Sequence, residues 1–230
     1  MKNLILSACA SVLFLGLTSC SNDESLDNVN LEAQAKSLKS YKVKKDINGR
    51  YSIDYTLNSN TTSETVKGNG SSDIYLYAGE VAGKEKHNEN LSLENNQLSV
   101  NFVENSKTKT SFIVEDENIL LAKGENNNKF LQEHSFYVED NIVQLDFKVR
   151  KGINVTFVYN ELNDIYEVHL KQGKSNGVSF SKNFVKNDGN PLKIDFVNHL
   201  NTSSRGEELA SRPRRPRVVV GGGGDAEEVS

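Results

Sequence analysis

Residues 41–57, YKVKKDINGRYSIDYTL, determine the fold class that the sequence predicts. Tyr51, Ile53, Tyr55 and Leu57 alternate with polar residues, which is the period of a strand that buries one face. The dipeptide Asn48-Gly49 separates this run from the apolar-polar run before it. Asn-Gly is typical of a two-residue hairpin turn, because both turn residues adopt positive φ. The stretch therefore predicts two antiparallel strands joined by a tight turn.

The same alternation recurs along the chain, with β-branched and aromatic residues in the runs and Gly, Asn and Asp between them. Further runs lie at 98–102, 143–149, 166–170, 178–180 and 192–196, and weaker turn signals lie at 95–96, 163–164 and 173–177. We predict an all-β domain over residues 41–200, an antiparallel meander of about eleven to twelve short strands that forms a sandwich or a barrel. No clear internal repeat is visible in the sequence.

Composition and charge narrow the class of protein. The chain has 230 residues, of which 36% are hydrophobic and 25% charged, with a formal net charge of −4. This slightly acidic balance gives no support to nucleic-acid binding. Both cysteines, Cys9 and Cys20, precede the predicted domain, so it contains no disulfide framework and no cysteine zinc site. No metal or other cofactor is predicted.

The N-terminus resembles a lipoprotein signal. The apolar run over residues 4–17 is too short to span a bilayer, so residues 1–19 are interpreted as a secretory signal peptide. Leu17-Thr18-Ser19-Cys20 resembles the bacterial lipobox. That resemblance implies cleavage before Cys20, lipidation of its sulfur and new amino group, and a membrane partner. The alternative is an ordinary secretory signal with a chance cysteine.

The residues after Cys20 concern the side of the outer membrane on which the protein lies. Ser21-Asn22-Asp23-Glu24 resembles the acidic signal of surface-exposed lipoproteins of the Bacteroidota. The resemblance implies an outer-membrane lipoprotein on the cell surface, and the alternative is a plain tether on an inward-facing one. Residues 20–40 are interpreted as a polar stalk, either a tether or a short helix over 29–39.

The composition changes after residue 200. Residues 201–230 contain most of the arginines and a run of four glycines, and are predicted to be a disordered tail. Prolines within 212–217 argue against a place inside a sheet, because proline lacks the ladder donor. The segment is interpreted either as a basic tail that binds an anionic surface or as sequence of different coding origin, and the second interpretation is favoured.

Candidate ligand-binding residues are few. Tyr51 and Tyr55 share one strand face and Tyr75 and Tyr77 another, so each pair could form a stacking shelf for sugars or a lipid-facing wall, with a core position as the alternative. His169 lies on the polar face of its strand. All four histidines are interpreted as solvated, and their spacing provides no local metal pair. No catalytic residue is assigned, because the G-x-S-x-G match at 173–177 has a strand after it in place of the required helix.

Three hypotheses about function follow. The first is a non-enzymatic binding or assembly module at the cell surface, whose partner is an envelope protein, a glycan or a lipid. The second is a carrier that holds an apolar ligand in a β cavity. The third and least favoured is an enzyme, for which His169 and Glu167 are the residues to test.

Overall fold

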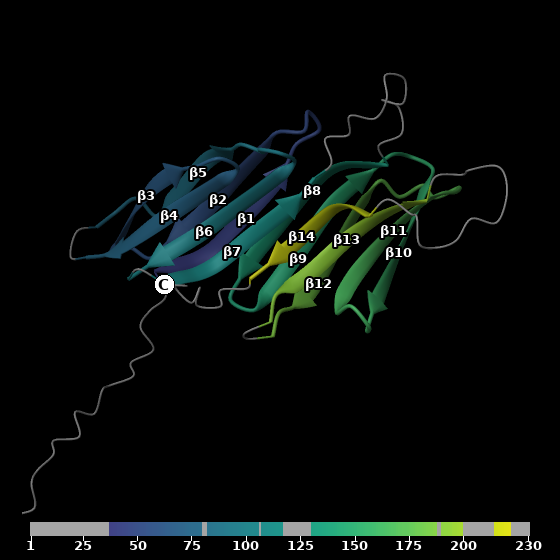
Figure 1. Cartoon of the computed structure of the whole chain (residues 1–230). Helices are drawn as coiled ribbons and strands as arrows, with labels where there is room; N and C mark the ends of the chain where they lie inside the picture. The colour runs from purple at the N-terminus through teal and green to yellow at the C-terminus, as the bar shows by residue number, and fades with distance from the viewer. Residues whose placement is uncertain are drawn as a thin grey trace, which may run out of the picture. The chain divides into compact units, whose positions relative to one another are not determined.

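The structure, a computed structural model, describes residues 37–79, 82–105, 107–116, 130–187, 190–199 and 214–221. Within these ranges the chain forms fourteen β-strands and no helix (Figure 1). The all-β prediction is confirmed, with more strands than expected. Cys20, the signal peptide and most of the stalk lie outside the described residues. The first strand already begins at Leu38, inside the segment interpreted as stalk.

The strands form two sheets. The six-stranded sheet has the order β12-β9-β8-β1-β2-β5 and consists of β1 (Leu38–Lys45), β2 (Tyr51–Leu57), β5 (Lys86–Leu91), β8 (Leu131–Glu139), β9 (Ile142–Val149) and β12 (Ser179–Val185). The eight-stranded sheet has the order β10-β11-β13-β14-β7-β6-β4-β3 and consists of β3 (Thr61–Lys67), β4 (Ser71–Ala78), β6 (Gln97–Glu104), β7 (Lys107–Glu115), β10 (Ile153–Asn160), β11 (Ile165–Gln172), β13 (Leu192–His199) and β14 (Arg214–Val220).

One hydrophobic core joins the two sheets. Alternate residues of each strand point inward, as the sequence period predicts. Aromatic rings from opposite sheets meet there: Tyr41 lies 5.2 Å from Phe102, and Phe147 lies 5.5 Å from Phe196, measured between ring centroids. Burying each such ring contributes about 1.5–3 kcal/mol. The two sheets therefore pack over a shared core in the manner of a β-sandwich.

The meander is interrupted by two parallel pairs. β4 pairs with β6 and β11 with β13 in parallel, and in each case the strand between them in sequence, β5 or β12, belongs to the other sheet. The predicted antiparallel meander therefore describes ten of the twelve strand pairs between the described strands, and these two parallel pairs are added to it. The turn signal at 173–177 accordingly belongs to a crossover between the sheets and not to a hairpin. The hairpin at Asn48-Gly49 is present, although only Gly49 has positive φ, at 83°.

The two halves of the chain have the same topology. Strands β1–β7 and β8–β14 follow one plan, because replacing every strand by its counterpart seven strands along gives each sheet order again, read from its other end. Like strands meet where the halves join, β1 with β8 and β7 with β14, both antiparallel. Figure 1 shows the purple-to-teal half beside the green-to-yellow half. The described strands thus form an internal repeat that the sequence did not reveal.

The registers of the two halves also agree. Ile74 pairs with Phe102 and Val168 with Phe196, a separation of 28 residues in both parallel pairs (102 − 74 and 196 − 168). Both of the next antiparallel pairs, β6–β7 and β13–β14, shift register at this position. A β-bulge is a built-in feature of a sheet that bends and twists a strand. The same bulge at the corresponding place in both halves therefore supports a common plan. The correspondence therefore extends to individual residues.

The prediction of a disordered C-terminal tail is wrong for residues 214–220. They form β14, which pairs with β13 on one side and β7 on the other. Val218 and Val220 are fully buried, and Arg217 donates two hydrogen bonds, of 2.8 and 3.0 Å, to the fully buried Asp195. The register shift near Pro216 lies where the ladder loses a donor, which explains how a proline fits inside the sheet. The rest of residues 200–230, apart from Gly221, lies outside the described residues.

Candidate functional site

Two of the predicted binding tyrosines are core residues. Tyr51 and Tyr55 are each 2% exposed, so their rings form no exposed shelf, although Tyr55 also lies beneath a hollow described below. The Tyr51 hydroxyl donates a 2.7 Å hydrogen bond to Asp116, which also pairs with Lys45. Burial and the neighbouring carboxylate raise the pKa of Tyr51 well above its ordinary value. These polar groups satisfy one another beneath the surface.

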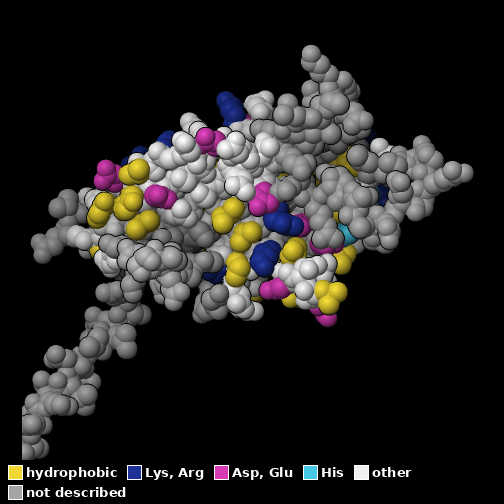
Figure 2. All heavy atoms as spheres, in the orientation of Figure 1, with side chains coloured by type: hydrophobic (Ala, Val, Ile, Leu, Met, Phe, Trp, Pro, Cys, Tyr) yellow, Lys and Arg dark blue, Asp and Glu magenta, His cyan; other side chains and the backbone are white. Residues whose placement is uncertain are grey.

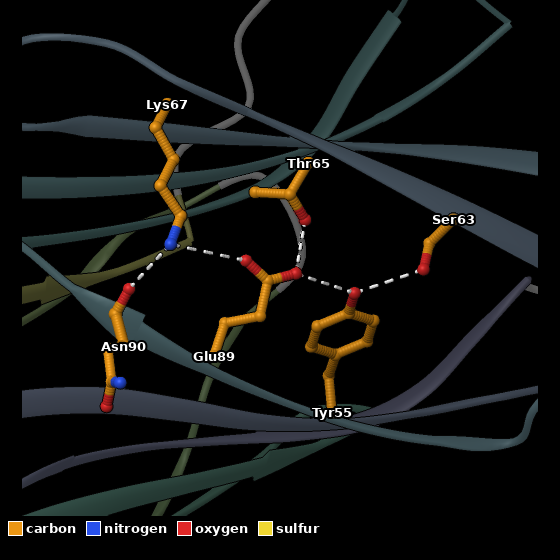
Figure 3. A network of polar contacts seen from close by, with 6 residues as sticks. All are labelled: Tyr55, Ser63, Thr65, Lys67, Glu89 and Asn90. Carbon is orange, nitrogen blue, oxygen red and sulfur yellow. Dashed lines mark hydrogen bonds and ion pairs between the residues drawn. The ribbon is translucent and has the colours of Figure 1, made fainter.

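Tyr55 belongs to a polar network that connects the edges of the two sheets (Figure 3). Its hydroxyl lies 3.0 Å from Ser63 Oγ of β3 and donates a 3.3 Å hydrogen bond to Glu89 of β5. Glu89 also accepts from Thr65 and lies 3.9 Å from Lys67 Nζ. Because β3 and β5 are edge strands of different sheets, the network closes this side of the sandwich with hydrogen bonds.

Tyr75 and Tyr77 point away from the core. Their neighbours Ile74 and Leu76 are buried, whereas Tyr77 is 50% exposed on the outer face of the eight-stranded sheet. Val66 on β3 is also about half exposed, and Figure 2 shows hydrophobic side chains at this β3–β4 end. The predicted tyrosine pairs therefore lie in two unconnected environments.

His169 lies in a chain of three polar residues on β11 and β13. Its Nε2 is 2.8 Å from Glu167 Oε2, and its Nδ1 is 2.7 Å from His199 Nε2. The structure thus brings together the two residues named for an enzyme, and adds His199. Both nitrogens of the His169 ring therefore have a polar partner within the protein. The described residues contain no group of three or more His, Cys, Asp or Glu arranged to hold a metal ion.

His134 contradicts the interpretation of solvated histidines. Its side chain is buried in the core, and neither ring nitrogen has a hydrogen-bond partner in the structure. Burial, aided by the charge of Lys45, lowers the pKa of His134 to about 3, so the ring is neutral near pH 7. His134 alternates with Phe136 and Val138, which are also buried. This alternation is the signal in the sequence from which the inward position of His134 could have been predicted.

The outer face of the six-stranded sheet contains a hollow of about 520 Å³, here named the first hollow. Paired residues of β1, β2 and β5 form rows that run across the three strands. Two rows point outward and flank the hollow, and the row between them points into the core. Tyr137 and Lys84 complete its lining. The outward rows are Ser40, Thr56 and Lys86, and Lys42, Asp54 and Asn88; the inward row is Tyr41, Tyr55 and His87.

The equivalent strands of the other half carry a second hollow, of about 620 Å³. All nine positions just described correspond, strand for strand and pair for pair, to residues that line it. Its rows are Glu133, Lys148 and Ser179, then His134, Phe147 and Phe180, then Ser135, Asp146 and Ser181. Even the rings agree: His87 stacks on Tyr55 at 4.7 Å, and Phe180 stacks on Phe147 at 5.3 Å. Lys42 lines both hollows.

The two hollows differ in charge. In the first hollow, partial burial raises the pKa of Asp54, but hydrogen bonds from Asn88 and Lys44 outweigh this and hold it below its ordinary value. Asp54 is therefore ionised and pairs with Lys44 at 2.9 Å. In the second hollow, Lys148 pairs with Glu133 at 2.8 Å. Three lysines and one aspartate line the first hollow, and four lysines and three acidic residues line the second. Three lysines of the second hollow, Lys44, Lys45 and Lys148, already pair with Asp54, Asp116 and Glu133.

Sequence reasoning did not find this surface. Strand alternation identified its outward residues as polar, yet polar outward residues occur on almost every half-exposed strand. The hollows became apparent only when topology placed β1 beside β8 and β5 beside β2. In the part of the chain that the structure describes, there is no helix long and apolar enough to cross a membrane. The chain matches no protein-family model, no curated protein and no solved structure.

Proposed function

We propose that this protein is a non-enzymatic binding module displayed on the bacterial cell surface by a lipid on Cys20. The observation that supports this is the pair of equivalent hollows on one sheet face. Their linings include hydroxyl, amide, ammonium, carboxylate and phenol groups beside aromatic rings, and the polar groups can form many hydrogen bonds with a ligand at once. The two hollows lie on either side of the β1–β8 pair, so an extended ligand could occupy both along the face of the sheet.

The carrier hypothesis receives less support. A lipid carrier needs space between its sheets, and in the described core that space contains rings in mutual contact, such as Phe112 and Phe136 at 5.5 Å. The apolar outward residues of β4 lie on the external face and line no cavity between the sheets. Native mass spectrometry of the full chain, purified from its own cells, tests this alternative. A stoichiometric lipid beyond the covalent anchor would favour the carrier.

Site-specific photo-crosslinking in living cells tests the binding surface. Tyr137, at the seam between the hollows and opposite Lys42, is replaced by a benzophenone amino acid of similar shape. Tyr77, on the outer face of the other sheet, receives the same replacement as a control. We expect a ligand adduct at 137 that decreases in a Lys42→Ala background, and none at 77. Equal adducts at both positions, or none at 137, would contradict the proposed surface.

Two further measurements test the attachment. Radiolabelled palmitate is expected to label the wild-type chain and not Cys20→Ser. Protease added to intact cells is expected to digest the wild-type protein. Protection of the chain in intact cells, with digestion after lysis, would place it on the inner side of the outer membrane.

A further inference from the structure

We propose that the first hollow binds the acidic groups of an acidic polysaccharide. This inference deepens the proposed function and depends on it. It names the ligand class for one hollow and assigns a different character to the other.

The charge of the first hollow favours an anion. Lys42, Lys84 and Lys86 line it, and none of them forms an ion pair with a carboxylate among the described residues. Asp54 is the one acidic residue of the lining, and Lys44 already pairs with it. Lys42 lies opposite Asp54, but Lys84 and Lys86 have no ion-pair partner among the described residues, and such lysines around a depression raise the local concentration of anionic ligands.

The fold holds these lysines in place. Lys86 lies on β5 opposite Thr56, within the sheet ladder. Lys84 precedes that strand, and its carbonyl oxygen is 2.7 Å from the Nε2 of His87. His87 in turn stacks flat on Tyr55, with an angle of 3° between the rings. The loop that carries Lys84 is thus fixed to the floor of the hollow, which reduces the entropy lost when a ligand binds.

The neutral groups of the lining favour a sugar polymer over an acidic peptide or a membrane. Ser40, Thr56, Asn88 and Tyr137 add hydroxyl, amide and phenol groups, which match the hydroxyls of a sugar. Anchoring at a bilayer surface requires an apolar wedge, and the rows of the first hollow that point outward contain none. Lys42 belongs to both hollows, so a chain of sugar units can continue from one into the other.

The second hollow offers that continuation fewer unpaired ammonium groups, because its Lys44 and Lys45 pair with Asp54 and Asp116. Its counterparts of Lys86 and Asn88 are Ser179 and Ser181, and its Lys148 is paired with Glu133. The acidic group of the polymer therefore belongs in the first hollow. Neutral parts of the polymer belong in the second.

Isothermal titration calorimetry with the full lipidated chain in detergent tests this assignment. The probes are polygalacturonate and dextran sulfate, and neutral dextran is the comparison ligand. The test variant is Lys84→Gln/Lys86→Gln, two exposed residues whose replacement leaves the core intact. The control Lys151→Gln/Lys174→Gln removes the same charge from two exposed lysines that do not line the hollow. We expect at least one acidic polymer to bind the wild type, about tenfold weaker binding by the test variant, and unchanged binding by the control.

Each other outcome overturns the assignment. Equal weakening by both variants would indicate general charge attraction, and equal binding of neutral dextran would remove the requirement for acid. Binding of polyglutamate or anionic vesicles through Lys84 and Lys86, without binding of either acidic polysaccharide, would identify a different ligand class. If no polymer binds while the crosslink at position 137 persists, the proposed function stands and the polysaccharide assignment fails. If the crosslink is also absent, both fail.

Discussion

Replacing His134 with phenylalanine tests the most unusual residue of the core. The ring lies 5.8 Å from that of Phe136 and 5.9 Å from that of Phe196, and it is neutral in the folded protein. In the unfolded chain the pKa of a histidine is about 6.5. Below that pH the unfolded state binds one more proton than the folded state, so acid favours unfolding until the pH approaches the folded pKa of about 3.

The expected magnitude follows from this difference. In its limiting range the group lowers the free energy of unfolding by about 1.4 kcal/mol for each pH unit of acidification. Between pH 7.5 and pH 5 the accumulated loss is about 2 kcal/mol. His134→Phe removes the titrating group and retains an aromatic ring, so its free energy of unfolding should decrease by about 2 kcal/mol less than that of the wild type over this interval.

Urea unfolding at pH 5, 6.25 and 7.5, followed by circular dichroism, measures the effect. Tyr41→Phe is the matched control, because Tyr41 occupies the equivalent position and its hydroxyl also lacks a partner. A tyrosine does not titrate between pH 5 and 7.5, so this control should show the pH dependence of the wild type. The reasoning is refuted if His134→Phe and the wild type lose the same free energy of unfolding on acidification.

Three further predictions concern the stability of the two sheets. A chain that ends after His199 lacks β14, the strand that joins the two halves of the eight-stranded sheet. We expect this shortened chain to lose cooperative thermal unfolding, because two strand edges are then left unpaired. A melting temperature within a few degrees of the wild type would contradict this. Asp195→Ala should cost about 3 kcal/mol because it leaves Arg217 without its buried partner, and Asp195→Leu/Arg217→Leu should recover most of the loss in the same urea assay. Glu89→Ala should cost about 1–3 kcal/mol, because it removes the acceptor of the Thr65 hydroxyl and one of the partners of the Tyr55 hydroxyl. An unchanged urea midpoint would show that Glu89 contributes nothing to stability through this network.

Strand periodicity predicted much of the fold. The alternation at Tyr51–Leu57 and at Val143–Val149 corresponds to β2 and β9, and inward positions such as Leu145 are fully buried. Periodicity does not indicate which strand pairs with which. The pairing of β4 with β6 depends on β5 crossing to the other sheet, a choice made by contacts between segments that are distant in sequence.

The C-terminal strand shows how composition can mislead. Arginine, proline and glycine around residues 214–221 indicated disorder, whereas the short run of valines at 218–220 was too brief to indicate a strand. Two neighbouring strands supply the hydrogen bonds, and Asp195 supplies a partner for Arg217. Tertiary context therefore overrides the local preference of this segment.

The internal repeat escaped detection because its two parts have changed to different degrees. Some core positions of the eight-stranded sheet keep their residues: Leu76, Leu98 and Phe102 correspond to Leu170, Leu192 and Phe196. Core positions of the six-stranded sheet differ, as Tyr41 and His134 do. Of the nine corresponding positions in the hollows, only Asp54 and Asp146 are identical.

This contrast has a physical reason. A core residue must fit its neighbours in both halves, because small changes of volume destabilise a packed interior. Outward residues on a strand have no such constraint, so the two hollows could change without loss of the fold. On the proposed assignment, the first hollow holds one end of a polar chain by ion pairs, and the second holds the next part mainly by hydrogen bonds. On this view, introducing lysine at Ser179, the counterpart of Lys86, should increase the affinity of the second hollow for acidic polymers without altering stability.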